Sequence, residues 1–110
     1  MRIHLVKEKS IRDYVLQNAG SQLPFQEWLS KLKRADWEKP SDMLCTYNSA
    51  GLLGKGCARV VFNIGGNNYR MICQFAFGER EVHLFVCWIG THAAYDKVCR
   101  DKKQYSINIY

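Results

Sequence analysis

The chain has 110 residues, of which 47% are hydrophobic and 24% are charged, and this size predicts a single domain over residues 1–110. No stretch approaches the roughly 18 to 20 apolar residues that span a bilayer, and the N-terminus is a mixed segment rather than an apolar signal sequence. We therefore expect a cytoplasmic protein without a membrane partner. The formal net charge of +6 is compatible with polyanions or an acidic protein as ligands, although solvated lysines alone also produce it.

Five cysteines are spread along the chain at wide intervals: Cys45, Cys57, Cys73, Cys87 and Cys99. They form no CxxC pair and no closely spaced Cys/His set of the kind that holds zinc. The sequence therefore predicts free thiols in a reducing compartment, no metal site and no cofactor.

The first half of the chain has helical periodicity after a short strand. Residues 1–6 alternate weakly and indicate an edge strand, and Ser10 then offers an N-cap for a short helix that Asn18 and Gly20 end. A second helix opens at Leu23 and Pro24, and its apolar residues recur at the spacing of one buried stripe. Further helical turns follow Pro40 before a loop over residues 49–56. The buried stripe consists of Phe25, Trp28, Leu29 and Leu32.

From Arg59 onward the period becomes extended and predicts three strands joined by two hairpins, over residues 59–64, 69–77 and 81–89. If the first turn is GGNN and the second is centred on Glu79 and Arg80, both registers place apolar side chains on one face. That face would pack under the helices as the core. Its predicted members are Val60, Phe62, Ile64, Met71, Cys73, Phe75, Phe77, Val82, Leu84, Val86 and Trp88.

The opposite face of this sheet is predicted to be open to solvent and partly basic. An open face with arginines, an amide and an aromatic ring suits RNA, whereas a merely solvated antiparallel face has the same periodicity. The residues on it would be Arg59, Asn63, Arg70, Gln74, His83, Phe85, Cys87 and Ile89.

A cluster of polar side chains follows the last strand, in the segment GTHAAYD at residues 90–96. If Thr91 caps a short helix, His92, Tyr95 and Asp96 lie near one helical face. Histidine titrates near neutrality and can exchange a proton with an RNA 2′-hydroxyl, while arginines stabilise charge on the phosphate. No motif for nucleotide hydrolysis, dinucleotide binding or zinc proteolysis is present. A histidine at a helix start can equally be structural.

The chain resembles the HigB-type branch of the RelE-like toxins of bacterial toxin-antitoxin systems. VFNI followed by NxYR at residues 67–70 and GTHxxYD at residues 90–96 carry the resemblance, which extends over about residues 11–98. It implies an α+β fold in which N-terminal helices pack on one face of a small antiparallel sheet, a three-stranded C-terminal meander plus an N-terminal edge strand. It also implies a metal-independent endoribonuclease, an mRNA interferase that cleaves mRNA on the translating ribosome and inhibits growth.

The partners and site residues implied by the resemblance follow the matching positions. The partners are a HigA-type helix-turn-helix antitoxin, mRNA and the ribosome, with operator DNA contacted only through the antitoxin. Arg70, His92 and Tyr95 are the catalytic candidates, with His92 in proton transfer, Arg70 on transition-state charge and Tyr95 positioning a base or phosphate. The RNA-binding candidates are Arg59, Asn63, Gln74 and Lys97.

Two features depart from the family pattern. Members commonly carry arginine in the last strand where this chain has Cys87, which leaves a catalytically impaired homologue that binds antitoxin or RNA as the alternative function. Residues 99–110 extend past the similarity, and their SINIY segment predicts an added edge strand, a partner contact or a frayed tail.

Overall fold

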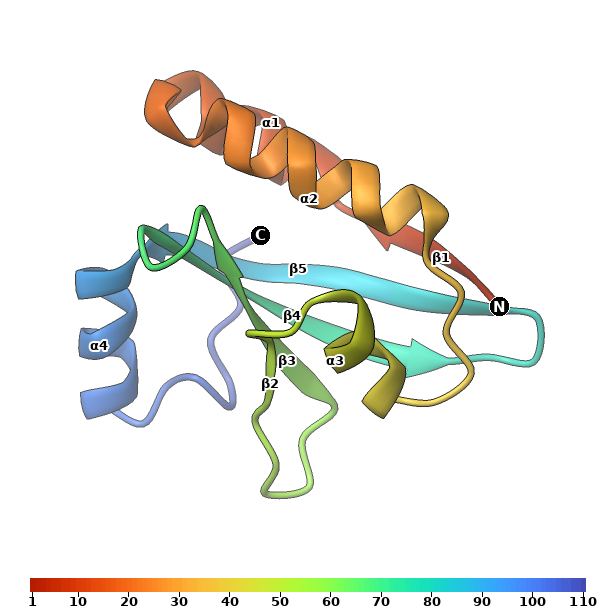
Figure 1. The fold of residues 1–110 in the computed structure, drawn as a ribbon. Coiled ribbons are helices and arrows are strands. Elements are labelled where there is room, and N and C mark those ends of the chain that lie inside the picture. The colour runs from red at the N-terminus through yellow and green to blue at the C-terminus, as the bar shows by residue number, and fades with distance from the viewer.

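The computed structural model describes residues 1–110 and contains a five-stranded mixed sheet with helices on both faces (Figure 1). The strands lie in the order β1-β5-β4-β3-β2. Helices α1 and α2 run side by side over one face, and α4 lies against the other face at the far end of β5 (Figure 1). The elements are β1 (Arg2–Val6), α1 (Glu8–Gln17), a 3-10 turn (Ala19–Ser21), α2 (Gln22–Arg34), α3 (Ser41–Thr46), β2 (Gly51–Leu52), β3 (Arg59–Ile64), β4 (Tyr69–Phe77), β5 (Glu81–Thr91) and α4 (His92–Arg100).

The α+β fold with helices packed on a sheet is confirmed, but the sheet is mixed rather than purely antiparallel. The N-terminal strand β1 is an edge strand, as predicted, and it pairs in parallel with β5, with Ile3 opposite Val82. A short strand β2 also pairs with β3 at the opposite edge. The β1–β5 pairing joins strands from opposite ends of the chain, which is why strand patterns alone do not reveal it.

The predicted hairpin registers are confirmed for most of the meander. Phe62 pairs with Met71 across the first hairpin, and Phe75 pairs with Leu84 across the second. Gly65 and Gly66 in the first turn have φ values of 65° and 67°, a backbone region that glycine enters without strain. These registers place one apolar face under α1, α2 and α3, where the main core forms.

The end of β5 departs from the predicted face assignment. A β-bulge lies where Ile72 pairs with Trp88 while Cys73 pairs with Val86, so Cys87 is the extra residue. The alternation of β5 therefore shifts by one, and Trp88 lies on the second face while Ile89 joins the main core. The predictions for Trp88 and Ile89 are wrong for this reason, whereas Cys87 does lie on the second face beside Ile72.

The helices follow their apolar patterns, with one wrong cap. In α2, Phe25, Trp28 and Leu32 are buried as the stripe predicted. Helix α1 begins at Glu8 after Lys7, which has a φ of 68°, so Ser10 lies inside the first turn and caps nothing. No helix is both long and apolar enough to cross a membrane.

The second face of the sheet is not open along its whole length. Helix α4 and the C-terminal tail, residues 101–110, cover a second apolar cluster on this face. The backbone N–H of Ile109 donates to the carbonyl oxygen of Cys87 at 3.0 Å, beyond the point where β1 stops pairing with β5. The tail is therefore docked on the sheet without forming a strand. The cluster consists of Ile72, Cys87, Trp88 and Val98, with Ile107 of the tail packed against it.

Candidate active site

Helix α4 begins at the point where β5 ends, and two local contacts fix its first turn. The Thr91 hydroxyl accepts a hydrogen bond from the backbone N–H of Ala94 at 3.2 Å, so the predicted N-cap is confirmed. The backbone N–H of His92 donates to the carbonyl of Asn68 at 3.1 Å. His92 is thereby held against the turn between β3 and β4.

Arg70 lies on β4 opposite Gly90, two residues before His92. Its side chain is only 8% exposed, and its guanidinium donates to the carbonyl of Tyr69 at 3.1 Å and to the Asn67 side-chain oxygen at 3.4 Å. Arg70 forms no ion pair with a carboxylate. A nearly buried cation that has only neutral acceptors is a ready partner for an anionic ligand.

Tyr95 lies one turn into α4 and packs against Trp88, with ring centroids 6.1 Å apart. Burial raises the pKa of its phenol well above the ordinary value, the Cys99 thiol raises it further, and the positive charge of Arg70 opposes the shift. Tyr95 is therefore a neutral phenol at physiological pH. It lies close enough to Arg70 for the positive charge of the guanidinium to affect its pKa. A neutral phenol can donate a hydrogen bond or stack on a base.

Gly90 leaves the space that this arrangement needs. A Cβ atom at Gly90 would lie 2.5 Å from the Trp88 ring, so the indole folds directly over the glycine backbone. The bulge at Cys87 brings Trp88 to this face, and the missing side chain at position 90 lets its ring lie beside Tyr95, with the two ring planes tilted by 45°. Trp88 was not among the predicted site residues, because the bulge that places it leaves no pattern in the sequence.

His92 is exposed and pairs with an acidic residue on its own helix. Its Nδ1 atom lies 3.4 Å from Oδ1 of Asp96, four residues on, and both side chains are about half exposed. A proton on Nδ1 directed toward this carboxylate leaves Nε2 free for proton transfer. The end of the sheet where α4 begins therefore brings together the imidazole of His92, the guanidinium of Arg70 and the phenol of Tyr95.

The four predicted RNA-binding residues lie in different surroundings. Lys97 is exposed on α4, and Asn63 pairs with Arg70 at the end of β3. Gln74 is exposed farther along β4, opposite Arg59. Arg59 is 6% exposed, and the tail covers it, because its guanidinium donates to the carbonyls of Gln104 and Ile107 at 3.3 and 2.7 Å.

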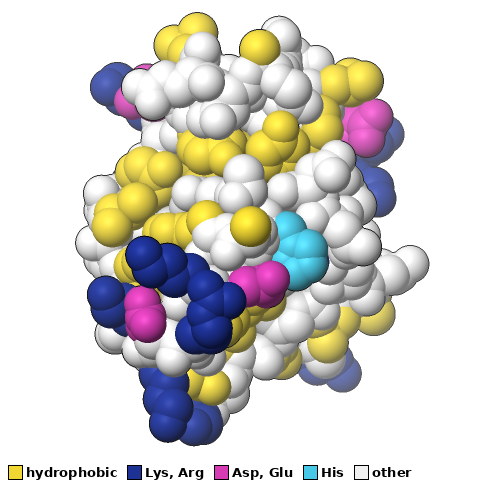
Figure 2. Space-filling model, turned by 90° about the vertical axis from the view of Figure 1, so that its left-hand side faces the viewer, with side chains coloured by type: hydrophobic (Ala, Val, Ile, Leu, Met, Phe, Trp, Pro, Cys, Tyr) yellow, Lys and Arg dark blue, Asp and Glu magenta, His cyan; other side chains and the backbone are white.

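Exposed cations surround the end of the molecule that carries α4. Figure 2 shows lysine and arginine side chains gathered on the lower part of this end, with a band of hydrophobic side chains above them. Helix α4 and the turn after it supply a set of exposed cations that includes Lys97, Arg100, Lys102 and Lys103. Such a set attracts a polyanion without reading its sequence.

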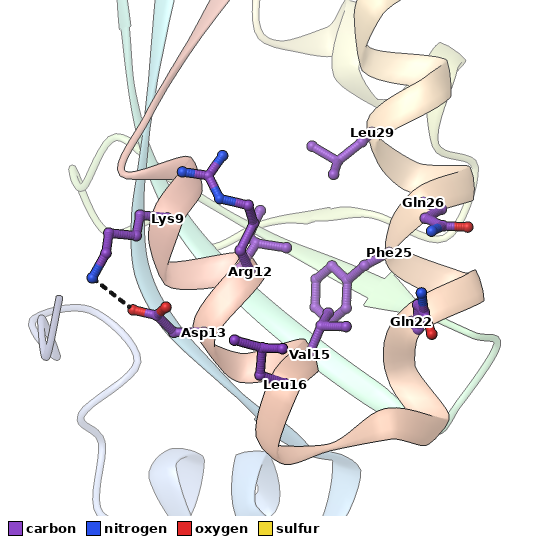
Figure 3. Close-up of a pocket in the computed structure, with 10 residues that line it drawn as sticks. Lys9, Arg12, Asp13, Val15, Leu16, Gln22, Phe25, Gln26 and Leu29 are labelled. Atoms are coloured by element: carbon purple, nitrogen blue, oxygen red, sulfur yellow. Dashed lines mark hydrogen bonds and ion pairs between the residues drawn. The ribbon is translucent and has the colours of Figure 1, made fainter.

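A separate groove of 440 Å³ runs between α1 and α2 (Figure 3). Its walls are mainly apolar, with Val15 and Leu16 from α1 facing Phe25 and Leu29 from α2. Leu16 is 83% exposed, and Leu23, which follows the lining residue Gln22 in α2, is 64% exposed. The helical layer thus carries an apolar surface apart from the α4 site.

Comparison with known proteins agrees with the fold and the motifs. A family model described as HigB_toxin, the RelE-like toxic component of a toxin-antitoxin system, matches residues 21–98. A search of curated proteins finds no match to the chain. The matched segment runs from the start of α2 almost to the end of α4 and includes Arg70, His92 and Tyr95. The chain therefore belongs to the HigB family of RelE-like toxins, the toxic components of toxin-antitoxin systems.

Proposed function

We propose that this protein is an endoribonuclease that cleaves mRNA on the translating ribosome and so inhibits translation and growth. The observation that carries the proposal is Arg70, a nearly buried guanidinium with no carboxylate partner, beside the helix start that bears His92. A scissile phosphate would supply the anion that Arg70 lacks. The first turn of α4 adds the positive end of a helix dipole to the same place.

The proposed reaction is attack by the RNA 2′-hydroxyl on the adjacent phosphorus. The new bond joins the 2′-oxygen to phosphorus, and the bond to the 5′-oxygen breaks, which leaves a 2′,3′-cyclic phosphate and a 5′-hydroxyl. His92 exchanges a proton with the 2′-hydroxyl or with the leaving 5′-oxygen, Arg70 stabilises the charge on the phosphate, and Tyr95 positions a base or the phosphate. The groups named supply proton transfer and charge stabilisation without a metal ion.

The predicted RNA contacts extend the site in two directions. Lys97 and the exposed cations after it would hold the backbone of mRNA or ribosomal RNA near His92. Asn63 and Gln74 would contact RNA along the second face, and Arg59 would join them only where the tail is displaced.

Induced expression in a bacterial host without the antitoxin tests the proposal. We expect growth arrest and new mRNA 5′ ends at ribosome-bound positions, mapped by primer extension. His92→Ala and Arg70→Ala should each lower cleavage by about a hundredfold or more, because each removes a group that acts in the transition state. The cleaved mRNA should carry 2′,3′-cyclic phosphate and 5′-hydroxyl ends, which end-specific labelling detects.

A matched control separates chemistry from general loss of charge. Lys33→Ala removes an exposed cation at the end of α2, away from α4, and should leave growth arrest unchanged. Soluble wild-type protein that neither arrests growth nor cleaves mRNA on ribosomes would contradict the proposal.

The alternative function is a catalytically impaired homologue that retains antitoxin or RNA binding. Its basis is Cys87, at a position where the resemblance implies an arginine. Cys87 is 2% exposed and lies under α4 and the tail. In this chain the position of Cys87 therefore contributes to packing. Arg70 would supply the positive charge that an arginine there provides. RNA binding by the wild-type chain without cleavage on ribosomes would favour this alternative.

We further propose that the antitoxin is a HigA-type helix-turn-helix protein and that it docks in the α1–α2 groove. The groove has mainly apolar walls, and the isolated chain leaves two leucines in water there: Leu16 in the wall, and Leu23, which adjoins the lining residue Gln22 in the chain. An amphipathic helix of the partner would cover them by a helix-in-groove contact. A partner there would block access to the ribosome by its bulk and leave His92 uncovered, and operator DNA would be bound through the partner alone.

A further inference from the structure

A second cluster of polar side chains lies at the opposite end of β5 from the α4 site. It consists of His4 on β1 with Glu81 and His83 on β5. The ligand atoms of these three side chains all lie within 4.8 Å of one another. Since β5 is 11 residues long, this cluster is about 30 Å from His92, and it has no part in the proposed RNA chemistry.

The parallel pairing of β1 with β5 brings the cluster together. His4 is directly opposite His83 in the register, so both side chains point to the same face of the sheet. Glu81 precedes His83 by two residues on the same strand and therefore points to that face as well. Three donors from two adjacent strands thus converge on one point of the second face.

The side chains already face one another. The rings of His4 and His83 have centroids 5.5 Å apart in an edge arrangement, and Nε2 of His83 lies 3.6 Å from Oε1 of Glu81. Arg2, which pairs with Glu81 in the register, forms no ion pair with it. The carboxylate is therefore free to bind a cation that the two imidazoles share.

We propose that His4, Glu81 and His83 form a binding site for a zinc ion. Two imidazole nitrogens and one carboxylate are a ligand set that zinc takes in proteins, and a water molecule would complete the tetrahedron. Ligand atoms on one tetrahedral zinc lie about 3.4 Å apart, so the most widely spaced atoms of the cluster need to approach by up to about 1.4 Å. His4 and Glu81 are exposed and His83 is partly exposed, so side-chain rotations can supply this contraction.

The bound ion would clamp the N-terminal strand to the centre of the sheet. Strand β1 is an edge strand with one neighbour, β5, and the ion would add a cross-link between the two. Zinc binds the folded arrangement because the unfolded chain does not hold residue 4 beside residue 83, so binding stabilises the fold. Phe85 stacks near His83 and limits the orientations of that imidazole.

Zinc titration of the full-length protein at pH 7.5 tests the site. Cysteine thiols also bind zinc, so the experiment uses a background in which the three thiols with solvent access, Cys45, Cys57 and Cys99, are serine. We expect one ion per chain by calorimetry, a thermal midpoint that rises with zinc concentration, and a visible absorption band of tetrahedral cobalt when Co²⁺ replaces zinc. The protein without ions provides the reference.

Single substitutions at the ligands separate this site from adventitious binding. His4→Ala, His83→Ala and Glu81→Gln should each weaken zinc binding by at least about tenfold and abolish the rise in thermal midpoint. Glu79→Gln, an exposed acid in the neighbouring turn, and His92→Ala, an exposed histidine that also faces a carboxylate, should leave both unchanged. Zinc binding that is equal in the ligand variants and the parent, or absent in the parent, would overturn the proposal.

Discussion

At the scale of single residues, two arginines on the second face of the sheet are unlike the arginines of a solvated surface. Arg59 and Arg70 are both nearly buried, and both donate only to neutral oxygens. Burial of a charged group without an opposite charge is unfavourable, so such positions are candidates for ligand binding. For Arg59 the tail supplies carbonyl acceptors, whereas Arg70 lies beside the start of α4, where a phosphate could approach.

At Cys87 the family resemblance implies an arginine, whereas the structure buries this position among apolar side chains. The bulge places its side chain against Ile72, Trp88 and Val98, and the tail closes over it. An arginine here would bury a cation among apolar side chains. We expect Cys87→Arg to lower the free energy of unfolding by about 3 kcal/mol or more and to give no gain of growth inhibition.

Urea unfolding and growth assays on the same variants check this. Cys87→Ala removes only the thiol from the same buried position and should cost about 1 kcal/mol. A folded Cys87→Arg protein with greatly increased growth arrest would contradict the expectation, and it would favour the view that the wild-type chain is catalytically impaired.

At the scale of elements, a buried tyrosine ties α3 to α2. The Tyr47 hydroxyl donates to the carbonyl of Trp28 at 2.7 Å, and the two rings stack with centroids 5.4 Å apart. Burial raises the pKa of Tyr47 well above its ordinary value, with a smaller contribution from Cys73. This end of the core therefore depends on a phenol that stays protonated.

The raised pKa has a defined effect on stability. The folded chain holds the phenol proton more tightly than the unfolded chain, so the contribution of Tyr47 is complete below pH about 10 and falls as the pH rises above that value. Tyr47→Phe should cost about 1 kcal/mol at pH 7 and make the decline above pH about 10 shallower. Urea unfolding between pH 7 and 11 measures both, and identical slopes for the two proteins would disprove this role.

The C-terminal tail is an element that lacks regular secondary structure but completes the second face. Deletion of residues 104–110 removes Ile107 from the apolar cluster and removes both carbonyl acceptors of Arg59. We expect the deletion to lower the free energy of unfolding by about 2 kcal/mol and to expose the Cys87 thiol to labelling reagents.

Denaturant unfolding and thiol labelling of the folded protein test this role of the tail. Asn108→Ala, at an exposed position within the tail, provides the control and should change neither quantity. Labelling at Cys87 is identified by its loss in a Cys87→Ala version of the deleted chain. Unchanged stability and unchanged labelling after the deletion would mean that the tail does not cover this face in solution.

At the scale of the whole molecule, the helical layer and the α4 end carry different surfaces. The groove between α1 and α2 is apolar, and the α4 end is cationic (Figures 2 and 3). A toxin that binds both a neutralising protein and RNA can use such a division, because each ligand then has its own surface. The division also allows the two binding activities to be separated by mutation.

Charged substitutions at the two exposed leucines beside the groove test the antitoxin proposal. Leu16→Lys or Leu23→Lys should weaken binding of the proposed helix-turn-helix antitoxin by about tenfold or more, because each places a cation in an apolar contact. Leu52→Lys, at an exposed leucine on β2, is the matched control. Growth arrest without the antitoxin should persist in all three variants, and unchanged antitoxin binding would rule out the groove.

The amino-acid sequence by itself determined most of the local structure of this protein. Alternation along residues 59–86, the two short turns and the Thr91 cap each depend on neighbours in the chain, and the structure follows them. The buried stripe of α2 and the family motifs could be predicted from the sequence for the same reason. The resemblance also supplied Arg70, His92 and Tyr95, whose catalytic roles stay predictions.

The tertiary structure alone decided the features that depend on contacts between distant segments. The bulge at Cys87 exchanged the faces of the sheet on which Trp88 and Ile89 lie. The tail covered Arg59, and the parallel pairing of β1 placed His4 beside His83. Each outcome depends on which edge or face remains free once the rest of the core has packed. Local turn geometry does not encode that competition, so a sequence without closely spaced metal ligands can still fold into a candidate zinc site.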